Sequence, residues 1–351
     1  MKVTADHDLT AHNTLRLPAR AQWWAQPASV AALQALVQDP AWQGLPRTVI
    51  GGGSNLVLEG TLPGLVIQPQ LRGIRVEQDD GSGLHVTVGA GEDWDHLVAY
   101  TVAQGWSGLE NLSLIPGTVG AAPVQNIGAY GVELCERLVS LEAVDLRTGT
   151  LQSFDNAACH FGYRDSYFKR EAPGRFAIVS VRLALRRQAE PVLHYADLAA
   201  RFAALPSAQQ NAAGVRELVC ALRRSKLPDP AQLPNAGSFF KNPLVSAARF
   251  DALQAEYPGV PGHRQADGSV KLAAGWLIEQ AGWKGRALGA VGMHDRQALV
   301  LVNHGGADGA AVRRLAAQVA ADVMARFGVG LEQEPIALGQ VLSPDAVSTP
   351  A

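Results

Sequence analysis

The sequence has few of the features that mark exported, membrane-bound or metal-binding proteins. Its three cysteines, Cys135, Cys159 and Cys220, lie far apart and form no C-x-x-C pair, so neither a disulfide framework nor a zinc site is expected. No apolar run approaches the ~20 residues that span a bilayer. The stretch from Met1 to His7 lacks a signal-peptide pattern. We therefore expect a cytoplasmic protein with reduced thiols and no bound metal.

Charge is also scarce. Charged residues make up 18% of the chain, and the net charge is -2 at pH 7, with no block of like charges. A basic surface for nucleic acid and a membrane-binding segment are therefore not expected. Apolar residues make up 47% of the 351 residues, which is enough for well-packed cores. Because one core rarely grows to this chain length, we expect two or three domains.

Short strands, Gly/Pro loops and a few amphipathic helices alternate along the chain, which is typical of an α+β protein. The alternation of apolar residues over 177–185 predicts a strand. Asp93 is predicted to cap a helix that ends at Gly105, and Ser269 to cap another, with Gly282 just past its end.

Two glycine-rich segments stand out, residues 51–55 (GGGSN) and residues 115–131. Glycines allow backbone N–H groups to approach an anion closely, so both segments suit a pyrophosphate. Neither matches G-x-G-x-x-G or G-x-x-x-x-G-K-[ST], and a Rossmann site and a P-loop are therefore unsupported. A glycine triplet alone is more often a tight turn.

The second segment resembles the flavin-contacting loop of the MurB family, the UDP-N-acetylenolpyruvoylglucosamine reductases. Other segments resemble further motifs of this family, in the family's order, from about residue 13 to residue 339. They are Asn13-Thr14, residues 162–166 (GYRDS), 226–230 (KLPDP), 235–243 (NAGSFFKNP) and 331–335 (LEQEP). The set is far more specific than any one of its members.

The resemblance implies an α+β architecture with two parts. The first is an N-terminal FAD-binding unit of the p-cresol methylhydroxylase or vanillyl-alcohol oxidase type, and the second a C-terminal α/β MurB-type substrate domain. We expect the FAD-binding region in residues 1–190, with subdomains of roughly 1–70 and 71–190. The substrate-binding domain is expected in residues 212–340, followed by a tail in residues 341–351.

The resemblance also implies an activity, the NADPH-dependent reduction of UDP-N-acetyl-3-O-(1-carboxyvinyl)-glucosamine to UDP-N-acetylmuramate in peptidoglycan precursor synthesis. Hydride would pass from NADPH to N5 of non-covalently bound FAD and then to the enolpyruvyl group. A monomer with a nucleotide-sugar as its small-molecule partner is expected. The implied cofactor contacts are Gly51, Gly52, Gly53, Ser54, Asn55, Pro116, Gly117, Thr118, Gly120, Ala121, Gln125, Asn126 and Gly128.

Hydride addition to the enolpyruvyl ether leaves negative charge beside the carboxylate, so the site needs a cation for the carboxylate and a proton donor. Arg164 can hold a carboxylate in two hydrogen bonds. The resemblance assigns Ser238 as the proton donor, which positive charge from Lys241 would assist. It assigns Glu334 as the acid that stabilises the enol-like intermediate with Arg164. Glu332 is the alternative acid, although the motif register favours Glu334.

The implied substrate contacts form a second set. Tyr195 resembles the tyrosine of the family's larger type, whose loop closes over the diphosphate. The complete set is Tyr195, Arg223, Lys226, Asn242 and Gln297. Taken alone, a lysine before proline or an exposed tyrosine has an ordinary surface explanation.

Three other functions compete with this interpretation. Residues 238–241 match the S-x-x-K of penicillin-binding proteins, but the companion S-D-N and K-T-G elements are absent from the sequence. A flavin oxidase of sugars or aromatic alcohols often binds FAD covalently through His or Cys, and neither glycine-rich segment contains such a residue. A non-catalytic nucleotide-sugar-binding protein would bind no flavin.

Overall fold

The computed structural model describes residues 1–339, so the expected tail in residues 341–351 lies outside the described part. Packing of the Cα atoms divides the chain into two compact units. Unit 1 comprises residues 1–7, 22–53 and 64–226, and unit 2 comprises residues 8–21, 54–63 and the chain from residue 227 onward. The chain therefore passes between the units several times.

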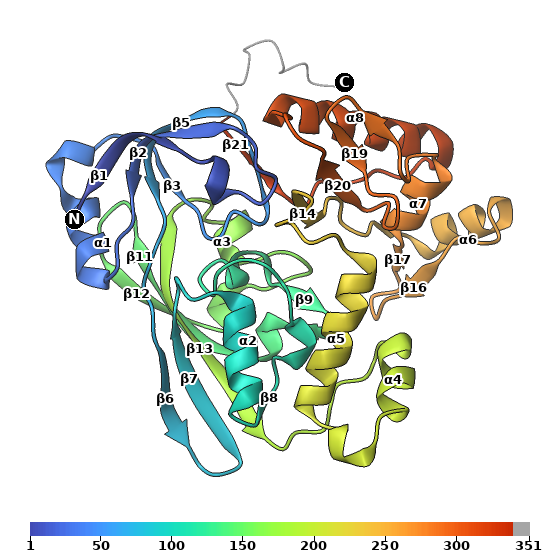
Figure 1. Ribbon diagram of the computed structural model, residues 1–351, viewed down its shortest axis with the longest axis horizontal. Coiled ribbons are helices and arrows are strands. Elements are labelled where there is room, and N and C mark those ends of the chain that lie inside the picture. The colour runs from blue at the N-terminus through green and yellow to red at the C-terminus, as the bar shows by residue number, and fades with distance from the viewer. Residues whose placement is uncertain (340–351) are drawn as a thin grey trace. The chain divides into compact units, whose positions relative to one another are not determined.

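A six-stranded sheet forms the centre of unit 1 (Figure 1). Its order is β12 (Leu151–Asp155), β11 (Leu138–Asp145), β13 (Phe176–Arg187), β7 (Gly83–Gly89) and β6 (Ile74–Asp79), with β8 (Trp106–Ser107) also paired to β13. The strand predicted over 177–185 is confirmed as β13, which pairs antiparallel with both β11 and β7. Alternate side chains of β7 are buried, as its two-residue period predicts.

Helix α2 (Trp94–Ala103) packs on this sheet through Trp94, Leu97 and Val98. The Oδ1 atom of Asp93 accepts a hydrogen bond from His96 N at 2.8 Å, which caps the first turn. The helix ends before Gly105, whose φ of +75° is the left-handed conformation that glycine adopts at little cost. The predicted cap and end of this helix are confirmed.

A four-stranded sheet runs in the order β1 (Val3–Asp8), β2 (Ala19–Ala25), β5 (Gly60–Ile67) and β3 (Arg47–Val49). Helix α1 (Val30–Gln38) packs against the unit 1 part of this sheet through Leu33, Leu36 and Val37. Other short elements of unit 1 include β9 (Gly128–Ala129), β10 (Val132–Glu133) and α3 (Tyr167–Arg170).

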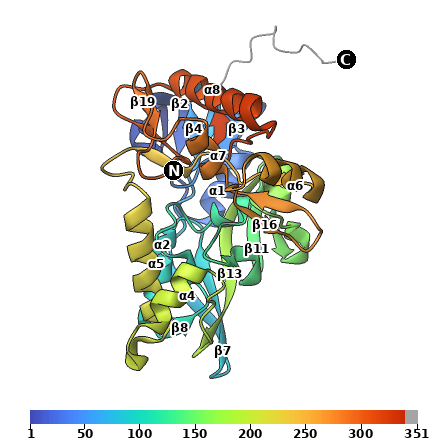
Figure 2. The same cartoon turned by 90° about the vertical axis from the view of Figure 1, so that its right-hand side faces the viewer.

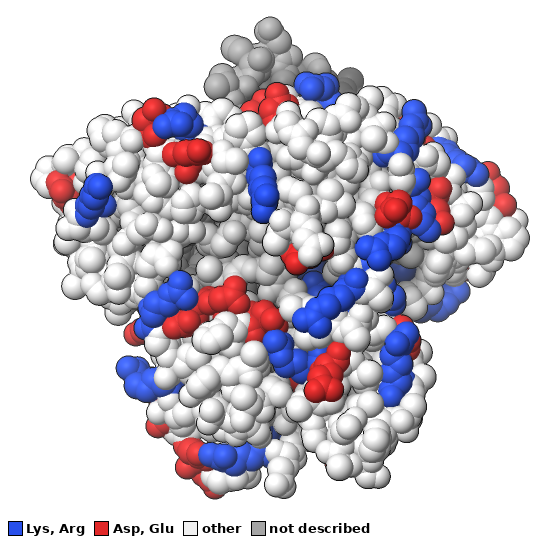
Figure 3. All heavy atoms as spheres, viewed as in Figure 1, with Lys and Arg blue, Asp and Glu red and all other residues white. Residues whose placement is uncertain are grey.

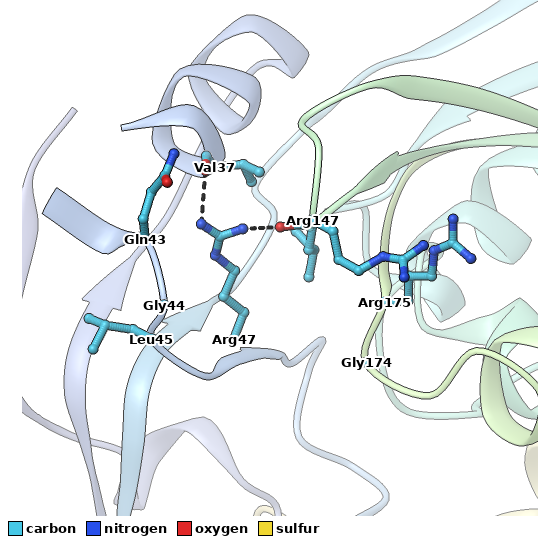
Figure 4. Close-up of a pocket in the computed structure, with 9 residues that line it drawn as sticks. Val37, Gln43, Gly44, Leu45, Arg47, Arg147, Gly174 and Arg175 are labelled. Carbon is cyan, nitrogen blue, oxygen red and sulfur yellow. Dashed lines mark hydrogen bonds between the residues drawn. The ribbon is translucent and has the colours of Figure 1, made fainter. Parts of the chain in front are cut away.

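A cavity of about 370 Å³ beside α1 is lined by three arginines and by none of the predicted site residues. Arg47 donates a hydrogen bond to the carbonyl of Val37, as Figure 4 shows. It also donates to the carbonyl of Leu146. Arg175 donates to Oδ2 of Asp145 at 2.8 and 3.0 Å. The charges of these two arginines therefore serve the packing of unit 1.

Helices α4 (Ala196–Ala203) and α5 (Ala212–Lys226) lie side by side (Figures 1 and 2). Their apolar faces form one buried cluster of Leu198, Phe202, Val215, Val219 and Leu222. This packing places α5 in unit 1, whereas the sequence-based boundary assigned residues from 212 onward to the C-terminal domain. The last passage of the chain from unit 1 to unit 2 lies after Lys226, where the helix ends.

The described residues of unit 2 include three small sheets and three α-helices. The first sheet has the order β14 (Asn235–Ser238), β20 (Val300–Asn303), β19 (Val291–Met293) and β18 (Ala287–Leu288). The second has the order β15 (Leu244–Val245), β17 (Val270–Leu272) and β16 (Gly262–Arg264). The third is the parallel pair of β4 (Leu56–Leu58) and β21 (Ile336–Leu338). The helices are α6 (Ala247–Glu256), α7 (Ala274–Gln280) and α8 (Gly309–Phe327). The buried face of α8 provides much of the core, with Leu315, Val319, Val323 and Phe327.

The prediction that Ser269 caps a helix is wrong. Ser269 lies in a turn, where its hydroxyl donates to Oδ1 of Asp267 at 2.6 Å, and strand β17 follows. Helix α7 begins only at Ala274, whose N–H donates to Oδ1 of Asn242 at 3.0 Å. The cap comes from a distant residue, which local sequence patterns do not reveal.

All three cysteines are free thiols, as predicted. Burial, with a smaller contribution from the charge of Asp155, raises the pKa of Cys159 to about 12. Within residues 1–339, no helix combines the length and the apolar character that a membrane span requires. On the face shown in Figure 3, Lys and Arg lie interspersed with Asp and Glu among uncharged residues.

Candidate active site

The two glycine-rich segments pack against each other within unit 1. A Cβ atom added to Gly51 would lie 2.6 Å from Oγ1 of Thr118, and one added to Gly52 would lie 3.0 Å from Cα of Gly117. A Cβ atom added to Gly120 would lie 2.5 Å from the Cβ of Ala90, which lies outside both segments. Only glycine permits these approaches, so the segments depend on each other for their shape.

Backbone N–H groups along this contact have no partner. Among the described residues, the N–H groups of Gly51, Gly52, Gly53, Gly117 and Thr118 donate no hydrogen bond. Neighbouring groups are satisfied, since Val119 N donates to Glu92 O and Gly120 N donates to Ala90 O, both at 2.9 Å. Unpaired N–H groups that gather on glycine-rich turns are the usual donors to phosphate oxygens. The residues therefore fit the pyrophosphate of a dinucleotide such as FAD.

We predict that Gly51→Ala greatly weakens FAD retention. The added methyl group would clash with Thr118 and with the Cβ of Ala121, which lies 2.8 Å from its position, and would separate the two segments. The FAD content of the purified variant, measured from its visible absorption, should fall to less than about a tenth of one equivalent at micromolar concentration. Gly83→Ala in β7 is the matched control, because Gly83, like Gly51, has no positive φ and the nearest atom to its added Cβ is the carbonyl oxygen of Leu185 at 3.7 Å, an ordinary van der Waals contact. Equal FAD content in Gly51→Ala and the unmodified protein would contradict the prediction.

Asn126 and Gly128, both predicted cofactor contacts, support Arg164 within unit 1. The buried side chain of Asn126 donates to Oε2 of Glu133 at 2.9 Å and to Gly162 O at 3.1 Å, and it accepts from Cys135 N at 3.0 Å. Its amide group is therefore engaged by the protein. A Cβ on Gly128 would lie 2.9 Å from Nη1 of Arg164, so glycine leaves the guanidinium its space.

Arg164 lies at the tip of a tight turn. Gly162 and Asp165 exchange backbone hydrogen bonds of 3.0 and 3.2 Å, and Arg164 between them has a φ of +53°. Its Nη2 donates to Gly128 O at 2.6 Å, and its Cζ lies 5.2 Å from the centre of the Tyr163 ring. These contacts hold the guanidinium beside the loop that carries Gly128.

Three predicted substrate contacts, Tyr195, Lys226 and Arg223, share a region of unit 1. Tyr195 is 44% exposed and packs edge-to-face on Tyr130 at 5.3 Å. The Nζ atom of Lys226 lies 5.7 Å from the centre of the Tyr195 ring and 3.4 Å from Oδ2 of Asp197. Two aromatic rings and a cation thus lie together at the start of α4 and the end of α5.

Arg223 is a half-buried cation on α5. No hydrogen bond or ion pair of its guanidinium is present within residues 1–339. Burial lowers the pKa of Arg223, an effect that Tyr130 and Asp95 partly oppose, whereas the charge of Arg164 adds to it. A desolvated guanidinium without an anionic partner favours the binding of an anionic ligand.

Ser238 and Glu334 lie on neighbouring segments of unit 2. Ser238 pairs with Val300 at the end of β14 and is half-buried. The next residue, Phe239, is buried; its N–H donates to Leu299 O at 2.8 Å, and its carbonyl accepts from Glu334 N at 2.9 Å. The predicted acid, Glu334, therefore pairs with the residue that directly follows the predicted proton donor, Ser238.

The two candidate acids differ in exposure, since Glu332 is exposed and Glu334 is partly buried. Oε1 of Glu332 accepts from Nζ of Lys241 at 2.5 Å, and this carboxylate is 70% exposed. An exposed, paired carboxylate is poorly suited to stabilise an intermediate. Lys241, which was expected to assist Ser238, forms an ion pair with Glu332. The pairing and exposure of Glu332 argue against it, and the assignment of Glu334 as the acid stays a prediction.

Three further predicted contacts, Asn55, Asn242 and Gln297, lie in unit 2. Asn55 belongs to unit 2, where its Nδ2 donates to Glu334 O at 3.4 Å and its carbonyl accepts from Ile336 N at 3.0 Å. Asn242 caps α7, and Oε1 of Gln297 lies 3.1 Å from the position of a Cβ on Gly275 in the same helix. Asn242 and Gln297 therefore lie near the start of α7.

Comparisons with known proteins agree with this division of features. Residues 21–155 match the model of the FAD binding domain, and residues 229–338 match that of the UDP-N-acetylenolpyruvoylglucosamine reductase C-terminal domain. A UDP-N-acetylenolpyruvoylglucosamine reductase from Azoarcus sp. is 56% identical over 340 residues, which cover 96% of this chain and 98% of that protein. The chain belongs to the UDP-N-acetylenolpyruvoylglucosamine reductase family.

Other members of the family support the same conclusion. The reductase of Paraburkholderia xenovorans is 53% identical over 336 residues, covering 95% of this chain and 97% of that protein. The crystal structure of the reductase from Thermus caldophilus shares the fold, with a TM-score of 0.66, 23% identity and coverage of 96% and 98% of the two chains. The family confirms the predicted α+β fold class, a flavin-dependent reductase, and the use of FAD and NADPH.

Proposed function

We propose that this chain reduces the enolpyruvyl ether of UDP-N-acetylglucosamine to UDP-N-acetylmuramate, as a cytoplasmic monomer in peptidoglycan precursor synthesis. The observation that carries the proposal is the set of unpaired N–H groups on Gly51, Gly52, Gly53, Gly117 and Thr118, within a chain of this reductase family. These groups would hold the FAD pyrophosphate. When bound, FAD supplies the hydride-transfer chemistry between NADPH and the enolpyruvyl group.

Three residues of the chain would stabilise and then neutralise the negative charge that arises on the substrate. Arg164 would hold the substrate carboxylate, since a guanidinium remains charged and forms paired hydrogen bonds. Glu334 would stabilise the enol-like intermediate together with Arg164. Ser238 would donate the proton that completes the reduction, because its hydroxyl is half-buried and held at the end of β14.

Binding of the nucleotide-sugar would use the cationic and amide groups of both units. In unit 1, Arg223 and Lys226 would neutralise the diphosphate, and Tyr195 would pack over it. In unit 2, Asn242 and Gln297 would contribute amide donors. The half-buried, unpaired guanidinium of Arg223 supports this assignment most strongly.

The test combines the purified protein, NADPH and the enolpyruvyl nucleotide-sugar. We expect FAD absorption in the protein, release of the flavin on denaturation, consumption of NADPH, and a product heavier by two hydrogen atoms in mass spectrometry. Reactions without the nucleotide-sugar, or with the already saturated product in its place, serve as controls. A protein that takes up no flavin, or one that binds flavin without consuming NADPH in response to the substrate, would refute the proposal.

A further inference from the structure

We propose that Asp95 is a positioning residue that fixes the cofactor-binding loop and the substrate-binding face of α5 relative to each other. The inference rests on the proposed function in one respect, the assignment of Arg223 as a substrate contact. Its basis is a single carboxylate in the first turn of α2 that binds both the backbone before the glycine-rich loop and a guanidinium of α5.

The first link joins Asp95 to the loop. Its Oδ1 accepts from Leu114 N at 2.7 Å, and Leu114 has a φ of +56°, which is costly for a leucine. Two residues further on the loop reaches Pro116 and then Gly117, whose carbonyl accepts from Trp94 N at 3.0 Å. The first turn of α2 thus holds the chain on both sides of Pro116, directly beside the unpaired N–H groups of Gly117 and Thr118.

The second link joins Asp95 to α5. Nη1 of Arg216 lies 2.6 Å from Oδ1, and its Nη2 lies 3.0 Å from Oδ2, a planar fork with directional bonds. The side chains are 18% and 25% exposed, so water screens the pair only partly. Burial alone would raise the pKa of Asp95, but the hydrogen bonds from Arg216 and Leu114 and the charge of Arg216 outweigh it and lower the pKa.

The fork bears on Arg223 because both arginines occupy one face of α5. Arg223 lies about two helical turns beyond Arg216, so a rotation of the helix moves both side chains together. The charge of Asp95 also acts on the guanidinium of Arg223. Loss of the Asp95–Arg216 ion pair would therefore displace Arg223, the proposed substrate-binding cation. Loss of the Asp95 carboxylate would also release Leu114 and the cofactor-binding loop.

If the ion pair were purely structural, its loss would lower the stability of the protein without affecting both substrate binding and FAD retention. The chain contains a second ion pair that serves as a control. Asp145 also accepts one backbone N–H, from Arg147 at 2.8 Å, and the guanidinium of Arg175 at 2.8 and 3.0 Å. It is the last residue of β11 in unit 1 and, within the described residues, has no bond to either glycine-rich segment or to α5. Asp145→Asn therefore measures the cost of breaking such a pair elsewhere.

The experiment compares Asp95→Asn, Arg216→Lys and Asp145→Asn in the FAD-loaded enzyme. For Asp95→Asn we expect the KM for the nucleotide-sugar to rise by about tenfold, while kcat stays within about threefold, because binding groups rather than reacting groups are displaced. FAD should dissociate at least several-fold faster, as followed by the recovery of flavin fluorescence on dilution. Arg216→Lys keeps the charge without the fork and should change KM and FAD release in the same direction, which also provides a second variant should Asp95→Asn fail to fold.

Binding is also measured without turnover, by titrating the absorption of the oxidised flavin with the nucleotide-sugar. Asp145→Asn should lose thermal stability comparable to that lost in Asp95→Asn but keep the midpoint of this titration. Equal midpoints in all variants would overturn the positioning role. Arg223→Gln separates this result from a failure of the proposed function: if Arg223→Gln binds the substrate normally, the assignment of Arg223 is wrong, whereas weakened binding in Arg223→Gln with normal binding in Asp95→Asn refutes only the role of Asp95.

Discussion

Replacing Ser238 by alanine should leave the reduction of the bound flavin by NADPH nearly unchanged and slow the reduction of the enolpyruvyl substrate by roughly 10²–10⁴-fold. The substitution removes only the hydroxyl. Ser238 is the last residue of β14, and its neighbour Phe239 keeps the backbone bonds to Leu299 and Glu334. The geometry of the strand should therefore persist while the proposed proton donor is lost.

Anaerobic stopped-flow absorption separates the two half-reactions. Oxidised enzyme is mixed with NADPH in one experiment, and prereduced enzyme with the nucleotide-sugar in the other. Ser153→Ala, an exposed serine on β12 in unit 1, is the control and should change neither rate. Equal slowing of both half-reactions in Ser238→Ala would indicate a general disturbance and would remove the role assigned to Ser238.

Local patterns in the sequence predicted those elements whose ends are determined by nearby residues. The cap at Asp93, the end of its helix before Gly105 and the strand β13 follow from rules that operate over a few positions. The helix expected before Gly282 exists as α7, but the cap predicted at Ser269 was wrong, because Asn242, which lies far away in the sequence, accepts from the first N–H of α7. Its true start depends on tertiary structure.

The site shows the same limit. The glycine-rich segments were recognisable, yet the sequence did not reveal that Gly51 and Thr118 pack against each other, nor which N–H groups this contact leaves unpaired. The choice between Glu332 and Glu334 rested on the motif register, and the ion pair of Glu332 with Lys241 now supplies a physical reason. Asp95 and Arg216 belong to none of the quoted motifs, and only their contact points to a role.

Substitution of Arg164 by lysine should lower kcat/KM for the nucleotide-sugar by roughly 10–100-fold, although the positive charge remains. The guanidinium already donates to Gly128 O through Nη2 at 2.6 Å and lies 3.9 Å from Oε1 of Glu133 through Nη1. Its planar shape permits these contacts and further donation to a substrate carboxylate at once. A lysine ammonium is a single point of charge on a flexible stem, so it cannot maintain both sets of bonds.

Arg170→Lys is the matched control, because Arg170 lies on the neighbouring helix α3 and pairs with Asp165 and Glu171 at the surface. It should retain nearly full kcat/KM. A substrate analogue with a carboxamide in place of the carboxylate sharpens the test: the unmodified enzyme should discriminate strongly against it, and Arg164→Lys should discriminate much less, since the paired hydrogen bonds to the carboxylate are already lost. Discrimination that survives undiminished in Arg164→Lys would show that another group holds the carboxylate, and the charge on Arg164 would then serve the loop at Gly128 alone.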